Sequence, residues 1–373
     1  MIFPKKALLG YAALVAAVVD ATAIPPPTGK YGVGVRKLVI EHYNDHDPVA
    51  PNNISTSFLA TIFYPTKADC SRTDTGPYLD PVTAQLWEDI YNFTSGSLAS
   101  LTSTLQKDAP FLDGADEPSY PTLLFGPGAA GPSTECNSIL LSELASHGYT
   151  AVGLDHPYEH EWLRYPNGTG IPGLPLDYPW TLDELTALYE TRLADSLVFL
   201  DQFPQIVETL QAPINTTHIG TLGHSLGGAA AIGSLFDSDI FRSGIDLDGT
   251  LWGRPALDSS EADTKKPSLL LGFEGHFDES YRTYPDFQTA YWRGVRINGT
   301  VHNDFSDVSF WKTVGTADPP EGTIGLRQVH ILRTLVSAFF DYTLLGGEPP
   351  AILDGPTEGF PELWYFDGEG PMN

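Results

Sequence analysis

Positively charged residues are scarce in this chain of 373 residues. It has 20 Lys and Arg against 47 Asp and Glu, and its formal net charge at pH 7 is −27. A surface this acidic repels the phosphate backbone of nucleic acids and resists adsorption to anionic membranes. The composition therefore argues against a nucleic-acid-binding protein, and we expect no nucleic acid partner.

Cysteine is also nearly absent. Cys70 and Cys136 are the only two, and they form neither a zinc-ligand cluster nor a redox motif. In an oxidising compartment they can form one disulfide, and the sequence does not decide whether they do. The histidines and acids of "DHPYEHEW" (155–162) are explained by a turn after a strand. We predict no metal and no organic cofactor.

Long apolar runs are missing after the first residues of the chain. One run, from Ala7 to Val19, follows Lys5 and Lys6 and precedes small residues that end at Ala23. It is shorter than the roughly 20 residues of a membrane span and has the layout of a secretory signal peptide. We predict a signal peptide over 1–23, no transmembrane segment, and a secreted, extracellular protein.

Asn-x-Ser/Thr sequons occur five times on this exported chain and predict a glycoprotein in a eukaryotic host. The candidate sites are Asn53, Asn92, Asn167, Asn215 and Asn298.

Apolar runs rich in β-formers alternate with helical patterns from about residue 120 onward. This order predicts an α/β fold, with a mostly parallel sheet of roughly eight strands flanked by helices. The first two expected strands have no helix between them and can form an antiparallel edge. We expect one domain over 24–373 with an insertion around 67–119. The expected strands are 30–40, 57–66, 120–128, 149–157, 218–223, 242–249, 267–273 and 291–299, and the expected helices are 137–148, 181–203, the segment after Ser225, and 325–345.

A serine stands between glycines where one of these strands meets a helix. Gly223-His224-Ser225-Leu226-Gly227 matches the G-x-S-x-G pattern. Small residues on either side allow the sharp turn that lifts a serine hydroxyl off the sheet, and the following helix offers its free N–H groups. The pattern predicts that Ser225 is a nucleophile and that the backbone N–H of Leu226 stabilises an oxyanion.

A nucleophilic serine needs a base and an acid. His302 follows the last central strand, and the carboxyl ends of parallel strands lie at the same sheet edge as the turn around Ser225. His302 is therefore our predicted base. His276 is its main competitor. For the acid, Asp246, Asp248, Glu274 and Asp278 all lie near strand ends, and the residues alone leave the choice between them open.

Three segments resemble the platelet-activating factor acetylhydrolase family of α/β hydrolases. They are "GHSLGGAAAIGSLF", "FRSGIDLDGTLWG" and "VHNDFSDVSF", in this order. The resemblance implies an α/β-hydrolase fold with Ser225 as nucleophile, His302 as base and Asp248 as acid. It also places a second oxyanion N–H at Ala129, in "FGPGAAG", where the family often has His-Gly instead of Pro-Gly.

The resulting hypothesis is a secreted serine esterase that hydrolyses short acyl esters through an acyl-enzyme. The resemblance implies phospholipid substrates of the 1-alkyl-2-acetylglycerophosphocholine type. The alternatives are a broad carboxylesterase or polyester hydrolase, and an inactive hydrolase-fold binding protein. Four aromatic residues near the site can line a substrate pocket or pack in the core: Trp252, Phe273, Phe305 and Trp311.

Overall fold

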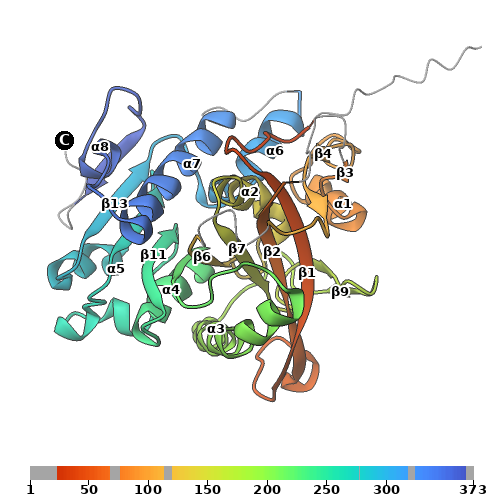
Figure 1. Cartoon of the computed structure of the whole chain (residues 1–373), viewed down its shortest axis with the longest axis horizontal. Helices are drawn as coiled ribbons and strands as arrows, with labels where there is room; N and C mark the ends of the chain where they lie inside the picture. Colours follow the sequence, from red (N-terminus) through yellow and green to blue (C-terminus); the bar gives the residue numbers. More distant parts are fainter. Residues whose placement is uncertain (1–22, 68–75, 113–119, 277, 318–323, 367–373) are drawn as a thin grey trace, which may run out of the picture.

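Six apolar segments form the parallel centre of one large twisted sheet (Figure 1). The computed structural model describes residues 23–67, 76–112, 120–276, 278–317 and 324–366. In spatial order the parallel strands are β7 (Thr150–Asp155), β6 (Thr122–Gly126), β10 (Ile219–His224), β11 (Phe241–Leu247), β12 (Ser268–Phe273) and β13 (Trp292–Ile297). Their carboxyl ends lie at one edge, which is where ligand sites form in such sheets.

Antiparallel strands extend the sheet on both sides. β2 (Ser55–Thr66) pairs antiparallel with β7 and with β1 (Gly32–Asn44), so the expected antiparallel pair is present. All eight predicted strands occur. Two further strands join the same sheet, β5 (Gln106–Lys107) beside β1 and β14 (Leu363–Phe366) beside β13. The estimate of eight therefore falls short by two in the part of the chain that the structure describes.

Helices cover both faces of the sheet. The helices of one face are α2 (Ser138–Ser146), α7 (Leu326–Phe340) and α8 (Ala351–Asp354), whereas α3 (Leu182–Leu210), α4 (Leu226–Gly233) and α5 (Glu279–Thr283) pack on the other. Alternation along β12 shows the two layers. Leu269 and Leu271 belong to the apolar cluster that includes side chains of α7, whereas Leu270 belongs to the cluster that includes side chains of α3. Burial on both faces explains why the central strands are continuous apolar runs.

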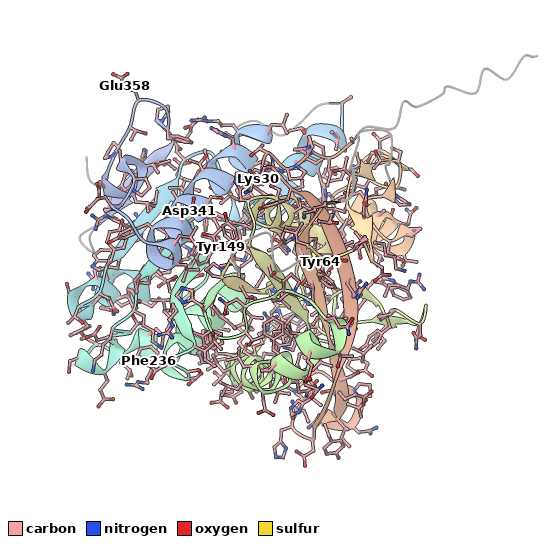
Figure 2. The ribbon with its side chains drawn as sticks, viewed as in Figure 1. Lys30, Tyr64, Tyr149, Phe236, Asp341 and Glu358 are labelled. Carbon is pink, nitrogen blue, oxygen red and sulfur yellow. The ribbon has the colours of Figure 1, made fainter. Side chains whose placement is uncertain are left out.

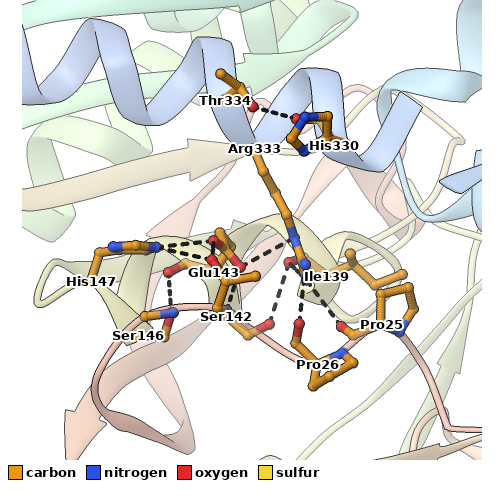
Figure 3. Close-up of polar contacts among 12 residues, drawn as sticks. Pro25, Pro26, Ile139, Ser142, Glu143, Ser146, His147, His330, Arg333 and Thr334 are labelled. Carbon is orange, nitrogen blue, oxygen red and sulfur yellow. Dashed lines mark hydrogen bonds and ion pairs between the residues drawn. The ribbon is translucent and has the colours of Figure 1, made fainter. Parts of the chain in front are cut away.

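Polar contacts fix the helices of the first face to each other and to the N-terminal segment. Arg333 of α7 donates hydrogen bonds to the carbonyls of Pro25, Pro26 and Ile139 and lies 3.3 Å from a carboxylate oxygen of Glu143 on α2 (Figure 3). Tyr149, just before β7, donates a 2.7 Å hydrogen bond to Asp341, and Figure 2 shows these two residues close together. These contacts therefore join α2, α7 and the N-terminal segment into one layer on this face of the sheet.

The region between β2 and β6 holds small elements of its own. Its described residues form α1 (Pro81–Ile90) and a two-stranded sheet of β3 (Gly76–Pro77) and β4 (Thr102–Ser103). Trp87 of α1 packs against Trp311 of α6 (Val308–Val314), 5.8 Å between ring centroids. A second small sheet pairs β8 (Trp162–Arg164) with β9 (Gly170–Pro172).

Short helical turns complete the elements. They are η1 (Pro51–Asn53), η2 (Thr134–Asn137), η3 (Ser234–Phe236), η4 (Arg254–Ala256), η5 (Ser260–Ala262), η6 (Tyr284–Phe287), η7 (His302–Phe305) and η8 (Asp341–Leu345). Among the described residues, no helix has both the length and the hydropathy needed to cross a bilayer. The predicted signal peptide, apart from Ala23, lies outside the described residues, as does Cys70. Cys136 is buried and carries a free thiol.

Candidate active site

Ser225 occupies a sharp turn between β10 and α4. Its backbone has φ 55° and ψ −125°, a conformation that a residue with a side chain rarely adopts. Its N–H donates to the carbonyl of Leu247, and its own carbonyl accepts from the N–H groups of Gly228 and Ala229. The turn therefore holds the serine at the N-terminus of α4, as the G-x-S-x-G pattern predicts.

The glycines of this turn are required by close backbone contacts. A Cβ atom on Gly223 would lie 2.2 Å from the carbonyl oxygen of Gly227, and one on Gly227 would lie 2.0 Å from the carbonyl oxygen of Gly126. Both contacts are with backbone, which cannot move aside. The glycines therefore let β10, α4 and the loop after β6 approach each other around Ser225.

Asp248 and His302 form a hydrogen-bonded pair at the same edge. Asp248 follows β11 directly, and His302 opens η7 beyond β13. The Nδ1 of His302 donates to Oδ2 of Asp248 at 2.5 Å. The carboxylate of Asp248 is buried, whereas the imidazole is 47% exposed. With Nδ1 bonded to Asp248, neutral His302 has Nε2 as a proton acceptor.

The competing histidine also binds Asp248. His276 donates from Nδ1 to Oδ1 of Asp248 and from Nε2 to Oδ2 of Asp278, both at 2.8 Å. Both ring nitrogens are therefore engaged, so His276 has no free nitrogen with which to take a proton from Ser225. Burial alone would lower the pKa of His276, but its bonds to the two carboxylates raise it to about 9.

The four candidate acids have different surroundings. Burial favours the neutral form of Asp248, yet hydrogen bonds from His276 and His302 hold its pKa below the usual value. Asp246 accepts from the N–H of Gly249, and burial raises its pKa to about 8. Glu274 accepts from the N–H of Gly299. Of the four, Asp248 is the one whose carboxylate bonds to His302.

His224 connects the turn to the loop of His302. Its Nε2 donates to the backbone carbonyl of His302 at 2.8 Å, and the two rings lie 4.7 Å apart. Burial, together with the nearby His302, lowers the pKa of His224 to about 3, so the ring is neutral. The G-x-S-x-G pattern gave no sign of this contact, because the position before the serine is variable in the pattern.

The loop after β6 carries the second predicted oxyanion donor, Ala129. Arg192 of α3 contacts this loop, because it donates a hydrogen bond to the carbonyl of Pro127 and also pairs with Glu159. Both partners of this ion pair are buried. The sequence did not indicate this contact, because a position within a long helix gives no sign of which loop its side chain reaches.

A cavity of about 550 Å³ opens over these residues. This volume lies within the usual range for small-molecule sites, roughly 300–1,000 Å³. The lining includes all five predicted catalytic and oxyanion residues: Ser225, Leu226, Asp248, His302 and Ala129. The rest of the lining comprises Gly128, Gly131, Leu176, Trp180, Leu185, His224, Thr250, Trp252, Phe273, His276 and Asn303.

The four aromatic candidates divide into two pairs. Trp252 and Phe273 line the cavity. Phe305 and Trp311 are buried in the core instead, because η7 and α6 turn them toward the helical layers. Trp180 lines the cavity without having been predicted, since it lies in a proline-rich loop where no periodic pattern indicated its direction.

This chain is similar to known esterases and acetylhydrolases. Residues 194–316 match the family model "Platelet-activating factor acetylhydrolase, isoform II". A probable 1-alkyl-2-acetylglycerophosphocholine esterase of Arthroderma benhamiae is 26% identical, over 95% of this chain and 96% of that protein. The platelet-activating factor acetylhydrolase of Canis lupus familiaris is 24% identical, over 80% of this chain and 71% of its own length.

A solved structure supports the fold. The ferulic acid esterase from Streptomyces cinnamoneus superposes with a TM-score of 0.76, over 92% of this chain and 99% of that chain, at 24% identity. This match concerns the fold alone. Together with the family model and the two relatives, it agrees with the resemblance that the sequence shows: this chain has the α/β-hydrolase fold and is similar to the platelet-activating factor acetylhydrolases.

Proposed function

We propose that this chain is an exported serine esterase of lipid degradation. Its expected reaction is the removal of short acyl groups, including the acetyl group of 1-alkyl-2-acetylglycerophosphocholine. Carboxylic ester hydrolysis is the activity that the names of the curated relatives share. The observation that carries the proposal is the convergence of Ser225, His302 and Asp248 on one cavity, with His302 bonded to Asp248.

The mechanism follows from the positions of these groups. Nε2 of His302 takes the proton of Ser225 as Oγ attacks the ester carbonyl, and Asp248 stabilises the imidazolium that forms. His302 then gives its proton to the leaving alcohol. Water, activated by the same imidazole, hydrolyses the acyl-enzyme and restores the serine.

The developing oxyanion is stabilised by backbone N–H groups. Leu226, at the first position of α4, and Ala129, in the loop after β6, both line the cavity beside Ser225. Each such donor typically contributes about 3–4 kcal/mol to the transition state. Arg192 supports the second donor, since its bond to the carbonyl of Pro127 fixes the loop that contains Ala129.

The cavity lining favours a neutral or zwitterionic ester. Its apolar lining comes from Leu176, Trp180, Leu185, Trp252 and Phe273. The described lining contains no Lys or Arg side chain that would attract an anionic ester. A volume of about 550 Å³ accommodates a short acyl group together with part of the alcohol.

A chain-length series tests the proposal. We expect kcat/KM to be highest for acetyl esters and to fall steadily toward octanoyl esters, both with 4-nitrophenyl esters and with phospholipids that differ only in the acyl group at position 2. Ser225→Ala should lower kcat by at least about 10⁴-fold, because it removes the nucleophile. Preference for medium chains or polymeric esters would favour the broad carboxylesterase. Full activity of Ser225→Ala would refute the mechanism.

We also propose that residues 24–373 are the mature protein and form one hydrolase domain, released from a signal peptide over 1–23. Ile24, the first residue after the proposed cleavage, is buried, and its N–H donates to the carbonyl of Thr102. Of the sequons, Asn53, Asn92 and Asn167 are exposed, as export with glycosylation requires, and Asn215 and Asn298 are partly buried.

A further inference from the structure

The carboxylate of Asp248 accepts hydrogen bonds from other groups besides His302. Its Oδ2 accepts from His302, and its Oδ1 accepts from the N–H of Phe273 and from Nδ1 of His276, each at 2.8 Å. The side chain of Asp248 has no exposed surface. A buried carboxylate depends on such donors to remain ionised.

His276 stands between two carboxylates. Its Nδ1 meets Asp248 and its Nε2 meets Asp278, and a carboxylate oxygen can only accept. Both nitrogens must therefore carry a proton, which makes the ring an imidazolium. The side chain of Asp278 is fixed in turn, because it accepts hydrogen bonds from the hydroxyl of Ser280 and from the N–H of Tyr281 at the start of α5.

We propose that His276 is a positioning residue that acts on His302 through Asp248. This inference rests on the function proposed above. The bond from Nδ1 fixes the rotamer of Asp248 so that Oδ2 meets His302. The positive charge of His276 also offsets part of the negative charge of Asp248, so less negative charge faces His302 and its unprotonated, basic form is favoured.

The other groups around His276 do not supply this charge. Asp246 of β11 has its pKa raised by burial to about 8 and is therefore mostly neutral at pH 7. Tyr281 of α5 lies against the ring of His276 in a tilted arrangement, 4.3 Å between centroids, and is neutral because burial raises its pKa. Arg296 of β13 interacts electrostatically with Asp278 and Tyr281. The imidazolium of His276 is thus the cation in direct contact with Asp248, beside His302 itself.

The test is the pH dependence of the reaction in His276→Gln and Asp278→Asn. Gln at position 276 removes the charge, so Asp248 favours protonated His302 and the acid limb of kcat/KM for 4-nitrophenyl acetate should move upward by about one pH unit. Asn at position 278 removes one of the two carboxylates that keep His276 charged. The acid limb of kcat/KM for Asp278→Asn should therefore also move to higher pH, but by less than that of His276→Gln. For both variants kcat should fall more than KM rises.

His330→Gln is the matched control. His330 is exposed on α7 and stacks on Phe360, and it does not line the cavity. This variant should keep the native pH profile. Unchanged acid limbs in both site variants, or limbs that move to lower pH, would overturn the inference.

A second readout does not depend on turnover. In the Ser225→Ala background, the Cε1–H signal of ¹³C-labelled His302 gives its pKa directly, with His302→Asn assigning the signal. Adding His276→Gln should move the titration midpoint of this signal upward by about one pH unit, as expected for the acid limb of kcat/KM. An unchanged midpoint would contradict the inference. If the native enzyme hydrolyses no ester, the proposed function fails while this titration still tests the role of His276.

Discussion

Asp246 and Asp248 stand two residues apart and yet differ in charge. Both are buried, but Asp248 accepts hydrogen bonds from two histidines, whereas Oδ1 of Asp246 accepts from the N–H of Gly249 and no histidine bonds to it among the described residues. Burial therefore raises the pKa of Asp246 to about 8 and leaves it largely protonated at pH 7. Surroundings, more than residue type, decide which of the two carboxyl groups is an anion.

This difference predicts a pH effect on stability. The folded pKa of Asp246 lies above the unfolded value of about 3.9, so its contribution to stability is full below pH 4 and is lost as the pH rises to about 8. The loss is at most about 1.4 kcal/mol per pH unit. Asn accepts the bond from Gly249 without a titratable group, so Asp246→Asn should remove this decline.

Urea unfolding of Asp246→Asn and of native protein at several pH values measures the effect. The variant should gain stability relative to the native protein between pH 4 and pH 8. Asp286→Asn, at an exposed position in η6, provides the control and should parallel the native curve. A stability difference between Asp246→Asn and native protein that stays constant with pH would show that Asp246 is ionised in the fold.

Some residues of the candidate site could be predicted from the sequence alone, and others could not. The position of Ser225 on a sharp turn was predictable because its pattern has a local steric cause, and the position of His302 at the same sheet edge because it follows a strand of the sheet. The choice among four acids needed the family resemblance, since hydrogen bonds to His302 depend on loop paths that no periodicity encodes. The contacts of His276 and Arg192 remained unpredicted for the same reason.

The turn around Ser225 is the element that joins three segments of chain. Gly227→Ala would place a Cβ 2.0 Å from the backbone oxygen of Gly126, which cannot yield without moving β6. We expect a loss of about 3 kcal/mol or more, measured by urea unfolding. Gly355→Ala is the control, because its φ of 165° suits any residue and nothing lies within 4 Å of its Cβ. Equal stabilities would refute the steric account of the turn.

Elements were predictable where their patterns are long. The eight strands that the sequence predicts have at least five residues each in the structure, with apolar runs that sheet burial on both faces produces. β5 has two residues and β14 has four, so neither carries a period that distinguishes a strand from a loop. The helix predicted to end at 203 continues to Leu210 through Pro204, because packing of Phe199 and Phe203 on the sheet outweighs the local effect of proline.

The whole molecule carries a strong negative field. Its net charge is −27, the described cavity lining contributes no Lys or Arg, and the imidazolium of His276 in that lining is paired with Asp248 and Asp278. An anionic ester such as 4-acetoxybenzoate should therefore be repelled at low ionic strength, and salt should relieve the repulsion. We expect its kcat/KM to rise several-fold from about 20 mM to about 500 mM NaCl, whereas that of neutral phenyl acetate stays nearly constant. A fall with salt for the anionic ester would indicate a cationic site and contradict this account.

The central claim is that Ser225 is the nucleophile of an esterase site completed by His302 and Asp248. Covalent labelling with a fluorophosphonate, followed by mass spectrometry of the digested protein, tests it most directly. The account predicts one adduct per chain, on the peptide that contains Ser225, with a labelling rate that falls sharply in His302→Ala. An adduct on a different residue, or turnover that persists after Ser225 is fully labelled, would contradict it.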